Sequence, residues 1–452
     1  MCGCRALLFL KHARFYMNGR ARRLAQYVVP MILSSICFFL YTIVDGIFIG
    51  HGVGVNGVGA VNMAIPFVMI VNALFMLTSV GGITVTAIRF GRGDISGANQ
   101  AFMHSFSATM VIAAVLGCAG IFFPGQIAHL LGADDTYFSM VHDYVFWYSV
   151  FLIPSGAAMI FQSFCRNDGS PVLVSVSVIA ATVCNVFGDW LTVFPLGMGV
   201  KGAAIATGVS QTISLIIVAF HFLLKKGQLR IGRFSPSAAL FGKVFKRGLP
   251  EMVSKFAAPL STIYLNYVLL RNFGASAVNA FSLLSYVASF SVAVFFGTAE
   301  GLQPLYGQSY GAKDSESLHY YFHAGLVINV AASIIIFVLL FFVGRPVCAL
   351  FNADEATLDL TMQEMPKYAL SFCAIAVTTV VSSYFYSTKR TKESLILNIV
   401  RSFIANTFAI VLLPLLFGTC IIWYTYFIAE LIPALLAAVQ YVVSERKGIV
   451  WK

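Results

Sequence analysis

The chain has 452 residues and a formal net charge of +11 at pH 7, and it is 59% hydrophobic and only 10% charged. An ordinary soluble domain has about 25% charged residues, so this composition excludes a soluble globular protein. An excess of positive charge can indicate a nucleic-acid partner, but here its distribution indicates a membrane instead, and we expect no nucleic-acid partner.

Apolar runs long enough to cross a bilayer, which takes roughly 20 helical residues, recur along the whole chain. The polar breaks between them are short, and we expect the longest runs to tilt or to extend past the membrane surface. The sequence therefore predicts an all-α membrane protein. Its twelve predicted transmembrane helices lie at about residues 24–50, 58–88, 99–123, 137–165, 171–194, 200–224, 249–271, 276–306, 318–343, 357–387, 393–417 and 419–443.

Lysine and arginine gather on one side of these spans. With the N-terminus in the cytoplasm, 23 of the 29 fall on the cytoplasmic side, three fall outside and three fall within spans or at their ends. This is the positive-inside bias of multi-pass proteins. We therefore expect a protein of the cytoplasmic (inner) membrane with both termini in the cytoplasm, as an even number of spans requires.

The most basic loop lies near the middle of the chain and divides twelve spans into six and six. On this basis we predict five segments in two lobes. They are a cytoplasmic N-terminal extension (1–23), an N-lobe (24–224), a cytoplasmic linker (225–248), a C-lobe (249–443) and a cytoplasmic C-terminal tail (444–452).

An internal repeat supports this division. HLLGADD at 129–135 matches ALFNADE at 349–355, and GRGD at 91–94 matches GAKD at 311–314, both at one constant offset in the sequence. Because each half has an even number of spans, both copies enter the membrane in the same orientation. Such parallel repeats are typical of transporters, whose substrate sites lie near the midplane between the halves. Asp94 and Asp314 in the two short loops are expected to cap the helices that follow.

Two carboxylates interrupt the apolar spans of the first half. Asp45 lies deep in the first span, and Asp189 lies in the fifth, four residues after Asn185 and thus on the same helical face. Intramembrane ionisable groups cost roughly 2.5 to 3.5 kcal/mol on insertion scales and indicate function. Two carboxylates and an amide can form an oxygen-rich pocket for a small hard cation, or can share a proton. The alternative is that neighbouring hydroxyl groups merely satisfy each carboxylate.

Four stretches together resemble the multidrug and toxic compound extrusion (MATE) family, most closely its bacterial and archaeal branch. They are LYTIVDGIFIG (40–50), GRGD (91–94), NVFGDWLTVFPLGMGVKGAAIATGVSQ (185–211) and GLQPLYGQSYGAKD (301–314). The resemblance covers nearly the whole chain from about residue 20. It implies a V-shaped pair of six-helix lobes and a cation-driven antiporter that expels organic, often cationic, compounds.

The resemblance also implies a cation site. In the archaeal branch of the family an Asp of the first helix, an Asn and an Asp of the fifth and a Thr of the sixth build it, and Asp45, Asn185, Asp189 and Thr207 stand at the matching positions. Na⁺ and H⁺ both remain open as the coupling ion, and no cofactor or other metal is expected.

Further residues are candidates for supporting roles. Tyr144 and Gln162 in the fourth span are possible donors around the cation site, or structural hydrogen-bond partners. Pro30 removes a backbone hydrogen bond fifteen residues before Asp45 and can let the first helix bend, although a static kink is an equal alternative.

The central cavity has its own candidates. Phe38 and Tyr41 can stack on an aromatic cation, with packing or lipid contact as the alternative. Glu300 and Glu430 can attract a cationic substrate, and for Glu300 the alternative is pairing with Lys255 or Arg401. Glu251 and Lys255 are spaced for an i,i+4 ion pair at the start of the seventh span. Because this pairing would occupy the Glu251 carboxylate, we do not expect a cation site in the C-lobe.

The sequence thus predicts a monomeric ion-coupled exporter of small organic compounds by alternating access. A lipid-linked oligosaccharide flippase is the alternative, but its pyrophosphate substrate favours a cationic cavity, whereas the intramembrane charges here are mostly acidic. The sequence contains neither a recognisable catalytic constellation nor a P-loop, so a membrane-embedded enzyme is disfavoured and no enzymatic activity is expected. A channel is disfavoured by the parallel repeat with an acidic pocket in one lobe.

Overall fold

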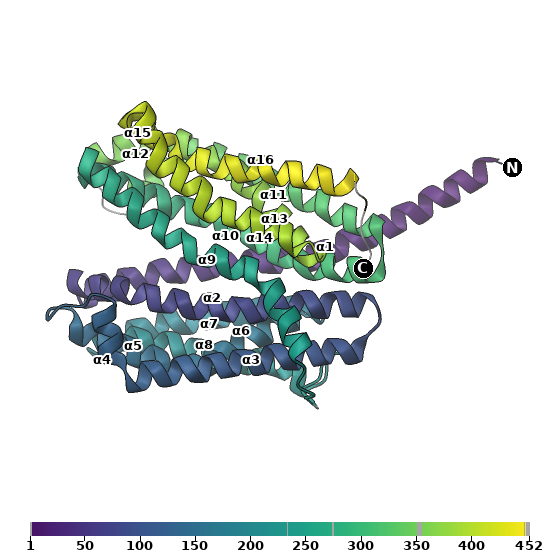
Figure 1. Ribbon diagram of the computed structural model, residues 1–452, viewed down its shortest axis with the longest axis horizontal. Helices are drawn as coiled ribbons and strands as arrows, with labels where there is room; N and C mark the ends of the chain where they lie inside the picture. The colour runs from purple at the N-terminus through teal and green to yellow at the C-terminus, as the bar shows by residue number, and fades with distance from the viewer. Residues whose placement is uncertain (1, 233, 274, 350–354, 447, 449–452) are drawn as a thin grey trace.

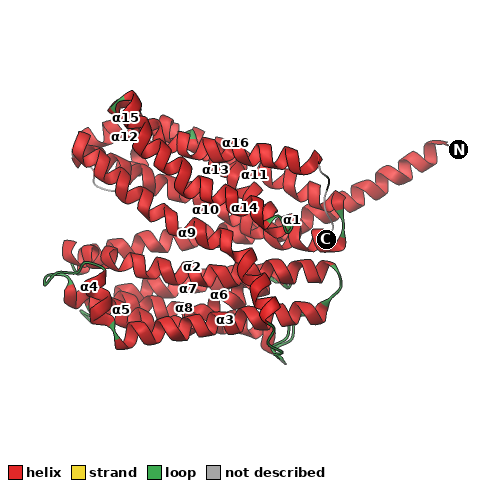
Figure 2. Ribbon diagram, in the orientation of Figure 1, coloured by secondary structure: helices red, strands yellow, loops and turns green. Residues whose placement is uncertain are grey.

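The computed structural model describes residues 2–232, 234–273, 275–349, 355–446 and 448. Side chains are not described at 2–18 and 256–279, nor at several single positions near other helix ends. Within the described ranges all regular elements are helices, joined by short loops (Figure 2). The predicted all-α fold is therefore confirmed.

Eight helices form the first half of the chain. They are α1 (Cys2–Gly52), α2 (Val55–Gly91), α3 (Ile95–Phe122), α4 (Pro124–Leu130), α5 (Phe138–Val150), α6 (Leu152–Asn167), α7 (Pro171–Val193) and α8 (Gly199–Leu223).

The second half has α-helices and three short π or 3-10 segments. They are α9 (Ala238–Phe273), α10 (Ala275–Ala312), α11 (Ser315–Ala349), α12 (Glu355–Ala369), α13 (Ser371–Ser387), α14 (Thr391–Ile399), the π segments η1 (Val400–Ala405) and η2 (Phe408–Leu412), α15 (Leu413–Phe417), the 3-10 segment η3 (Thr419–Tyr424) and α16 (Thr425–Arg446).

The number of spans is roughly consistent with the twelve predicted. Ten of the described helices are long and apolar enough to cross a membrane, and α5 with α6, bent by 53°, makes an eleventh. The remaining predicted span, 249–271, lies within α9. Two helices extend beyond the segment boundaries predicted from the sequence. α1 includes most of the N-terminal extension, and α9 begins at Ala238, inside the linker.

The helix bounds repeat in the register that the sequence motifs predict. When 91–94 is aligned with 311–314, α2 (55–91) coincides with 275–311, almost the whole of α10, and the starts of α3 and α7 coincide with those of α11 and α14. The bend between α5 and α6 at Phe151 corresponds, within one residue, to the break between α12 and α13 at Leu370. The two halves are therefore copies of one helical plan.

The repeated GRGD and GAKD loops cap the helices that follow them, as predicted. Asp94 Oδ1 accepts a hydrogen bond from the Gly97 backbone N–H at 2.8 Å, and Asp314 Oδ1 accepts one from the Ser317 N–H at 3.0 Å. Each carboxylate thus satisfies one of the free N–H groups at a helix start and complements the helix dipole.

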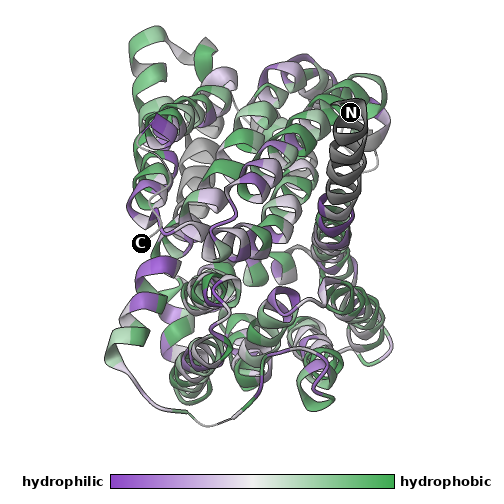
Figure 3. Ribbon diagram, turned by 90° about the vertical axis from the view of Figure 1, so that its right-hand side faces the viewer, coloured by the Kyte–Doolittle hydropathy of each residue, from purple (hydrophilic) through white to green (hydrophobic). Residues whose placement is uncertain are grey.

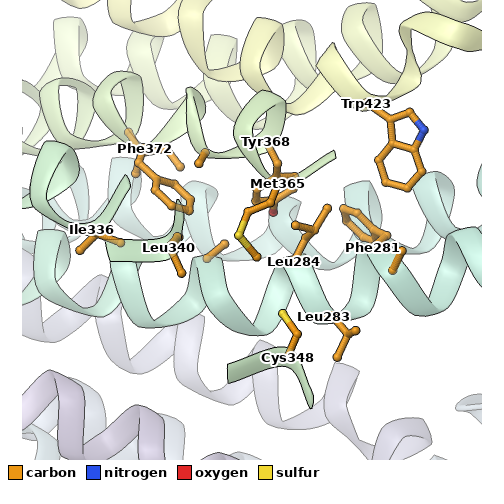
Figure 4. Packing of buried hydrophobic residues seen from close by; sticks show 14 of the residues in the cluster. Phe281, Leu283, Leu284, Ile336, Leu340, Cys348, Met365, Tyr368, Phe372 and Trp423 are labelled. Atoms are coloured by element: carbon orange, nitrogen blue, oxygen red, sulfur yellow. The ribbon is translucent and has the colours of Figure 1, made fainter. Parts of the chain in front are cut away.

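Each half has its own apolar core. In the second half Phe281 and Leu284 of α10 pack against Met365 and Tyr368 of α12 and against Phe372 of α13 (Figure 4). This layer of buried side chains holds the helices of the C-lobe together as a unit.

The two halves meet in the part of the bundle where α1 begins and α16 ends, which is the predicted cytoplasmic side, and their ribbons diverge toward the opposite end (Figure 1). Here α2 and α10 approach backbone to backbone. A Cβ atom at Gly91 would lie 2.0 Å from the Gln308 carbonyl oxygen, and one at Gly311 would lie 2.1 Å from that of Ile88. Only glycine permits this approach, so these positions set the distance between the lobes.

We predict that Gly311→Ala destabilises the protein by about 1 to 3 kcal/mol through overpacking against rigid backbone. Thermal unfolding of the purified protein in detergent measures this as a lower Tm. Gly242→Ala is the matched control, because a Cβ there meets nothing within 4 Å and α9 gains a better helix former. An unchanged Tm in Gly311→Ala would show that the interface between the lobes yields easily.

Candidate functional site

Asp45 lies on the last two turns of α1, seven residues before the helix ends at Gly52. At a rise of 1.5 Å per residue this is about 10 Å from the end of the helix. Its Oδ1 atom is buried and accepts no hydrogen bond. The carboxylate therefore has an unmet need for a donor or a cation.

Asn185 and Asp189 lie one turn apart on α7 and are 1% and 0% exposed. Small residues bring α8 close to this face, since a Cβ at Gly188 would lie 3.0 Å from that of Ala206. As a result the Asn185 amide donates to Thr207 Oγ1 of α8 at 3.4 Å. Three of the four residues of the predicted cation site are thus brought together by α7 and α8.

Asp45 completes this group. Its helix α1 packs along α7, and the carboxylates of Asp45 and Asp189 are close enough to repel each other. Four buried oxygen atoms here have no hydrogen-bond donor: Oδ1 of Asp45, Oδ1 of Asn185 and both carboxylate oxygens of Asp189. Leaving such atoms unpaired is costly, and a bound proton or a small hard cation removes that cost. We call these four residues, Thr207 included, the acidic site.

Of the predicted supporting residues, Tyr144 lies near the acidic site and Gln162 bonds elsewhere. Tyr144 is buried on α5 and feels the charges of both Asp45 and Asp189, as does Tyr41 on α1. The Gln162 amide instead donates to Ser214 of α8 at 2.7 Å. That bond ties α6 to α8, which is the structural alternative considered for this residue.

Pro30 lies inside α1, which continues through it as one helix. Its carbonyl oxygen accepts hydrogen bonds from the hydroxyl groups of Ser34, at 2.9 Å, and of Ser175 on α7, at 2.5 Å. The two hydroxyl oxygens are themselves 2.8 Å apart, within hydrogen-bond distance. These hydroxyl groups hold α1 against α7 next to the position where proline removes a backbone hydrogen bond.

Glu300 on α10 pairs across the interface between the lobes, with a partner that the sequence did not indicate. Arg166, at the end of α6, donates to its carboxylate at 2.8 Å, and the two side chains are 7% and 40% exposed. Neither Lys255 nor Arg401, the predicted alternatives, is the partner in this bond. Arg166 was missed because it follows its span directly and reads as one more cytoplasmic cation.

Glu430 on α16 is held within the C-lobe. Arg401 of η1 donates to both of its carboxylate oxygens at 2.9 to 3.2 Å, and the side chains are 14% and 9% exposed. The predicted i,i+4 pair of Glu251 and Lys255 is present at 4.0 Å. Glu430 and Glu251 are thus each paired with a basic side chain, whereas the carboxylates of the acidic site are not.

Phe38 and Tyr41 form an edge-to-face pair on α1 with ring centroids 5.0 Å apart. Phe38 is 53% exposed. Among the described residues no group of three or more His, Cys, Asp or Glu side chains is arranged to hold a metal ion.

Comparisons with known proteins agree with the fold. Two multidrug export proteins named MepA, from Staphylococcus saprophyticus and Staphylococcus aureus, are 22% and 20% identical, over 96% and 94% of this chain and of their own. A crystal structure of a MATE protein in complex with MaL6 has a TM-score of 0.89 at 20% identity, over 95% of this chain and 97% of the other. The Vibrio cholerae MATE transporter VcmN, in a mutant form, has a TM-score of 0.89 at 19% identity, over 96% and 99%.

The family profile MatE matches twice, at residues 30–191 and 250–412, once in each copy of the internal repeat. Together the two matches cover most of the chain, and they fall on the helices that build the two lobes. The chain therefore belongs to the MatE family, the multidrug and toxic compound extrusion family that its motifs predict.

Proposed function

We propose that this protein is a cation-coupled antiporter that exports organic, often cationic, compounds by alternating access. The observation that carries the proposal is the acidic site, where four buried oxygen atoms from α1 and α7 have no hydrogen-bond donor. Such a site gains free energy by taking up Na⁺ or a proton, which is the first step that a coupled exporter needs.

The interface between the lobes supports alternating access. The lobes contact each other at the predicted cytoplasmic end, through the glycines of α2 and α10 and through Arg166 with Glu300. We propose that this arrangement is the outward-facing state, in which the acidic site loads a cation from outside. Loading then lowers the affinity for substrate, the substrate leaves, and the lobes rock to release the cation into the cytoplasm. Coupling requires that cation and substrate bind the two states with different affinities.

Pro30 is the position at which α1 is proposed to bend during this cycle. The hydroxyl groups of Ser34 and Ser175 already bond to its carbonyl oxygen, so a bend at this point exchanges a few local hydrogen bonds. In the proposed mechanism the part of α1 that carries Asp45 moves when the cation binds, and the part toward the N-terminus stays against α10.

The substrate class is proposed from the relatives and from the charges of the cavity candidates. The MepA relatives are multidrug export proteins. Glu300 is the better candidate for attracting a cationic substrate, because its side chain is 40% exposed whereas that of Glu430 is 9% exposed and bonded on both oxygens. The exposed Phe38 ring with Tyr41 offers an aromatic face to an organic cation.

The flippase alternative is less well supported, since a pyrophosphate would have to enter beside the unneutralised carboxylates of the acidic site. We also propose a monomer in the cytoplasmic membrane with both termini in the cytoplasm. In support, α1 begins and α16 ends at the same end of the bundle (Figure 1).

Asp45→Asn is expected to abolish gradient-driven efflux of ethidium, because an amide neither carries the negative charge nor binds a proton. Efflux is measured in proteoliposomes with an imposed Na⁺ or H⁺ gradient, and the gradient that drives the native protein identifies the coupling ion. Asp135→Asn, an exposed carboxylate in the loop before α5, is the control that should retain native efflux.

Two results would contradict the proposal. Native efflux in Asp45→Asn would remove Asp45 from the coupling mechanism. Absence of efflux by the native protein under either gradient, with folded protein verified by its size-exclusion profile, would overturn the exporter assignment itself.

Thr207→Val tests the smaller claim that the Thr207 hydroxyl group supports cation binding. Valine keeps the shape of the side chain but removes its oxygen, so the cation concentration for half-maximal efflux should rise about tenfold, the equivalent of one hydrogen bond or ligand to a charged group. Thr212→Val on the same helix is the control, since its hydroxyl group bonds only to the Gly208 carbonyl at 2.8 Å among the bonds described. Equal effects of the two variants would argue for a general loss of α8 stability.

A further inference from the structure

The ion pair of Arg166 and Glu300 crosses the interface between the lobes with one side chain buried and the other partly open. Arg166 of the N-lobe is 7% exposed, whereas Glu300 of the C-lobe is 40% exposed. A single hydrogen bond joins them, from Arg166 Nη1 to Glu300 Oε2 at 2.8 Å. Among the described residues no donor bonds the other carboxylate oxygen, Oε1. The Glu300 carboxylate is therefore only half used by its partner.

Arg166 depends on Glu300 more than Glu300 depends on it. In the described part of the chain, Glu300 is the one carboxylate within ion-pair distance of the Arg166 guanidinium. Nη1 of Arg166 also lies 3.3 Å from Met31 Sδ of α1, and its Nε atom is buried without a hydrogen-bond partner. Removing the partner of a buried charge is costly. Arg166 therefore favours contact between the lobes only while the Glu300 carboxylate is available to it.

Close contacts of backbone with backbone determine where Glu300 lies. Two glycines flank it on α10. A Cβ at Gly297 would lie 2.9 Å from the Met31 carbonyl oxygen, and one at Gly301 would lie 2.8 Å from that of Tyr27, both on α1. Viewed from the predicted cytoplasmic end, hydrophilic segments of both lobes lie among hydrophobic ones (Figure 3). The ion pair thus forms where α1 and α10 touch, and separation of the lobes at this end breaks it.

The shared helical plan of the two halves does not require this pair. In the register of the repeat, Arg166 corresponds to Tyr386 and Glu300 corresponds to Val80. The second copy therefore places α13 beside α2 without charges at these two positions. A largely buried ion pair is weak evidence for stability, because desolvation offsets much of the attraction. The two charges are thus an addition to the fold, which indicates a function for them.

We propose that Arg166 takes the place of a cationic substrate at Glu300 when the lobes close at the cytoplasmic end. This inference rests on the alternating access proposed above. With the lobes apart at this end, Glu300 lacks its arginine and attracts a monovalent organic cation from the cytoplasm. When the lobes close, the guanidinium of Arg166 pairs with the carboxylate. The substrate then loses its counter-charge, leaves toward the outside and does not rebind.

Equilibrium binding of ethidium to the purified full-length protein in detergent tests the proposal, with fluorescence anisotropy as the measurement. Arg166→Gln should bind ethidium about tenfold more tightly than the native protein, because the competitor for Glu300 is removed. Misfolding does not produce tighter binding. Arg166→Lys keeps the positive charge and should bind like the native protein. In a Glu300→Gln background Arg166→Gln should change nothing, because the carboxylate for which the two cations compete is absent.

Arg20→Gln is the matched control. Arg20 of α1 pairs with Glu316 of α11 at 2.6 Å, which is also an ion pair between the lobes. This variant should bind ethidium like the native protein. Equal tightening in Arg20→Gln and Arg166→Gln would overturn the proposal in favour of a general loosening of the contact.

Two further results would overturn the proposal outright. They are unchanged binding in Arg166→Gln, and tighter binding that persists in the Glu300→Gln background. Binding at equilibrium needs no ion gradient, so it is independent of the efflux measurement. Absence of efflux by the native protein, together with tighter binding in Arg166→Gln, would contradict the antiporter and would leave the competition at Glu300 in place.

Discussion

The structure of the N-lobe depends on two carboxylates, Asp45 and Asp189, that are kept in an apolar bundle without a hydrogen-bond donor. Each such group costs roughly 2.5 to 3.5 kcal/mol on insertion scales, and their mutual repulsion adds to this. The surrounding packing holds them in place at that cost, since α7 and α8 approach through Gly188 and Ala206 and α1 is bonded to α7 through Ser34 and Ser175. A rigid frame around unsatisfied oxygen atoms is what a site for an exchangeable cation requires, because a site already satisfied by protein donors gains little from the cation.

The two copies of the internal repeat share one helical plan but differ in their buried charged residues. In the register of the repeat, Asn185 and Asp189 correspond to Ala405 and Ala409, so the C-lobe keeps the helical plan and lacks the acidic site. Among its described intramembrane charges, Arg401 and Glu430 pair with each other. One lobe is thus left with negative charge to be neutralised by a cation, and the other has its charges paired. That asymmetry is consistent with the cation coupling that we propose for the N-lobe.

Much of this was predictable from the sequence, because length, hydropathy and repetition act locally. The twelve spans, the register of the repeat and the caps at Asp94 and Asp314 follow from patterns that a single helix or loop carries. Pairings across the lobes were not predictable, since nothing in the spacing relates Arg166 to Glu300, which are 134 residues apart. Gln162 illustrates the same limit, because the residue that its amide contacts depends on how α6 is rotated against α8.

α1 is the element that connects the acidic site with the interface between the lobes. Toward its outer end it carries Asp45. Nearer the cytoplasm its backbone lies against α10, where a Cβ at Gly301 would be 2.8 Å from the Tyr27 carbonyl oxygen. In the same region Arg20 pairs with Glu316 of α11 at 2.6 Å. Pro30 separates these two regions. In the bending of α1 that we propose, the position with a missing backbone hydrogen bond resists movement least, because glycine contacts hold the helix at one end and Asp45 lies toward the other.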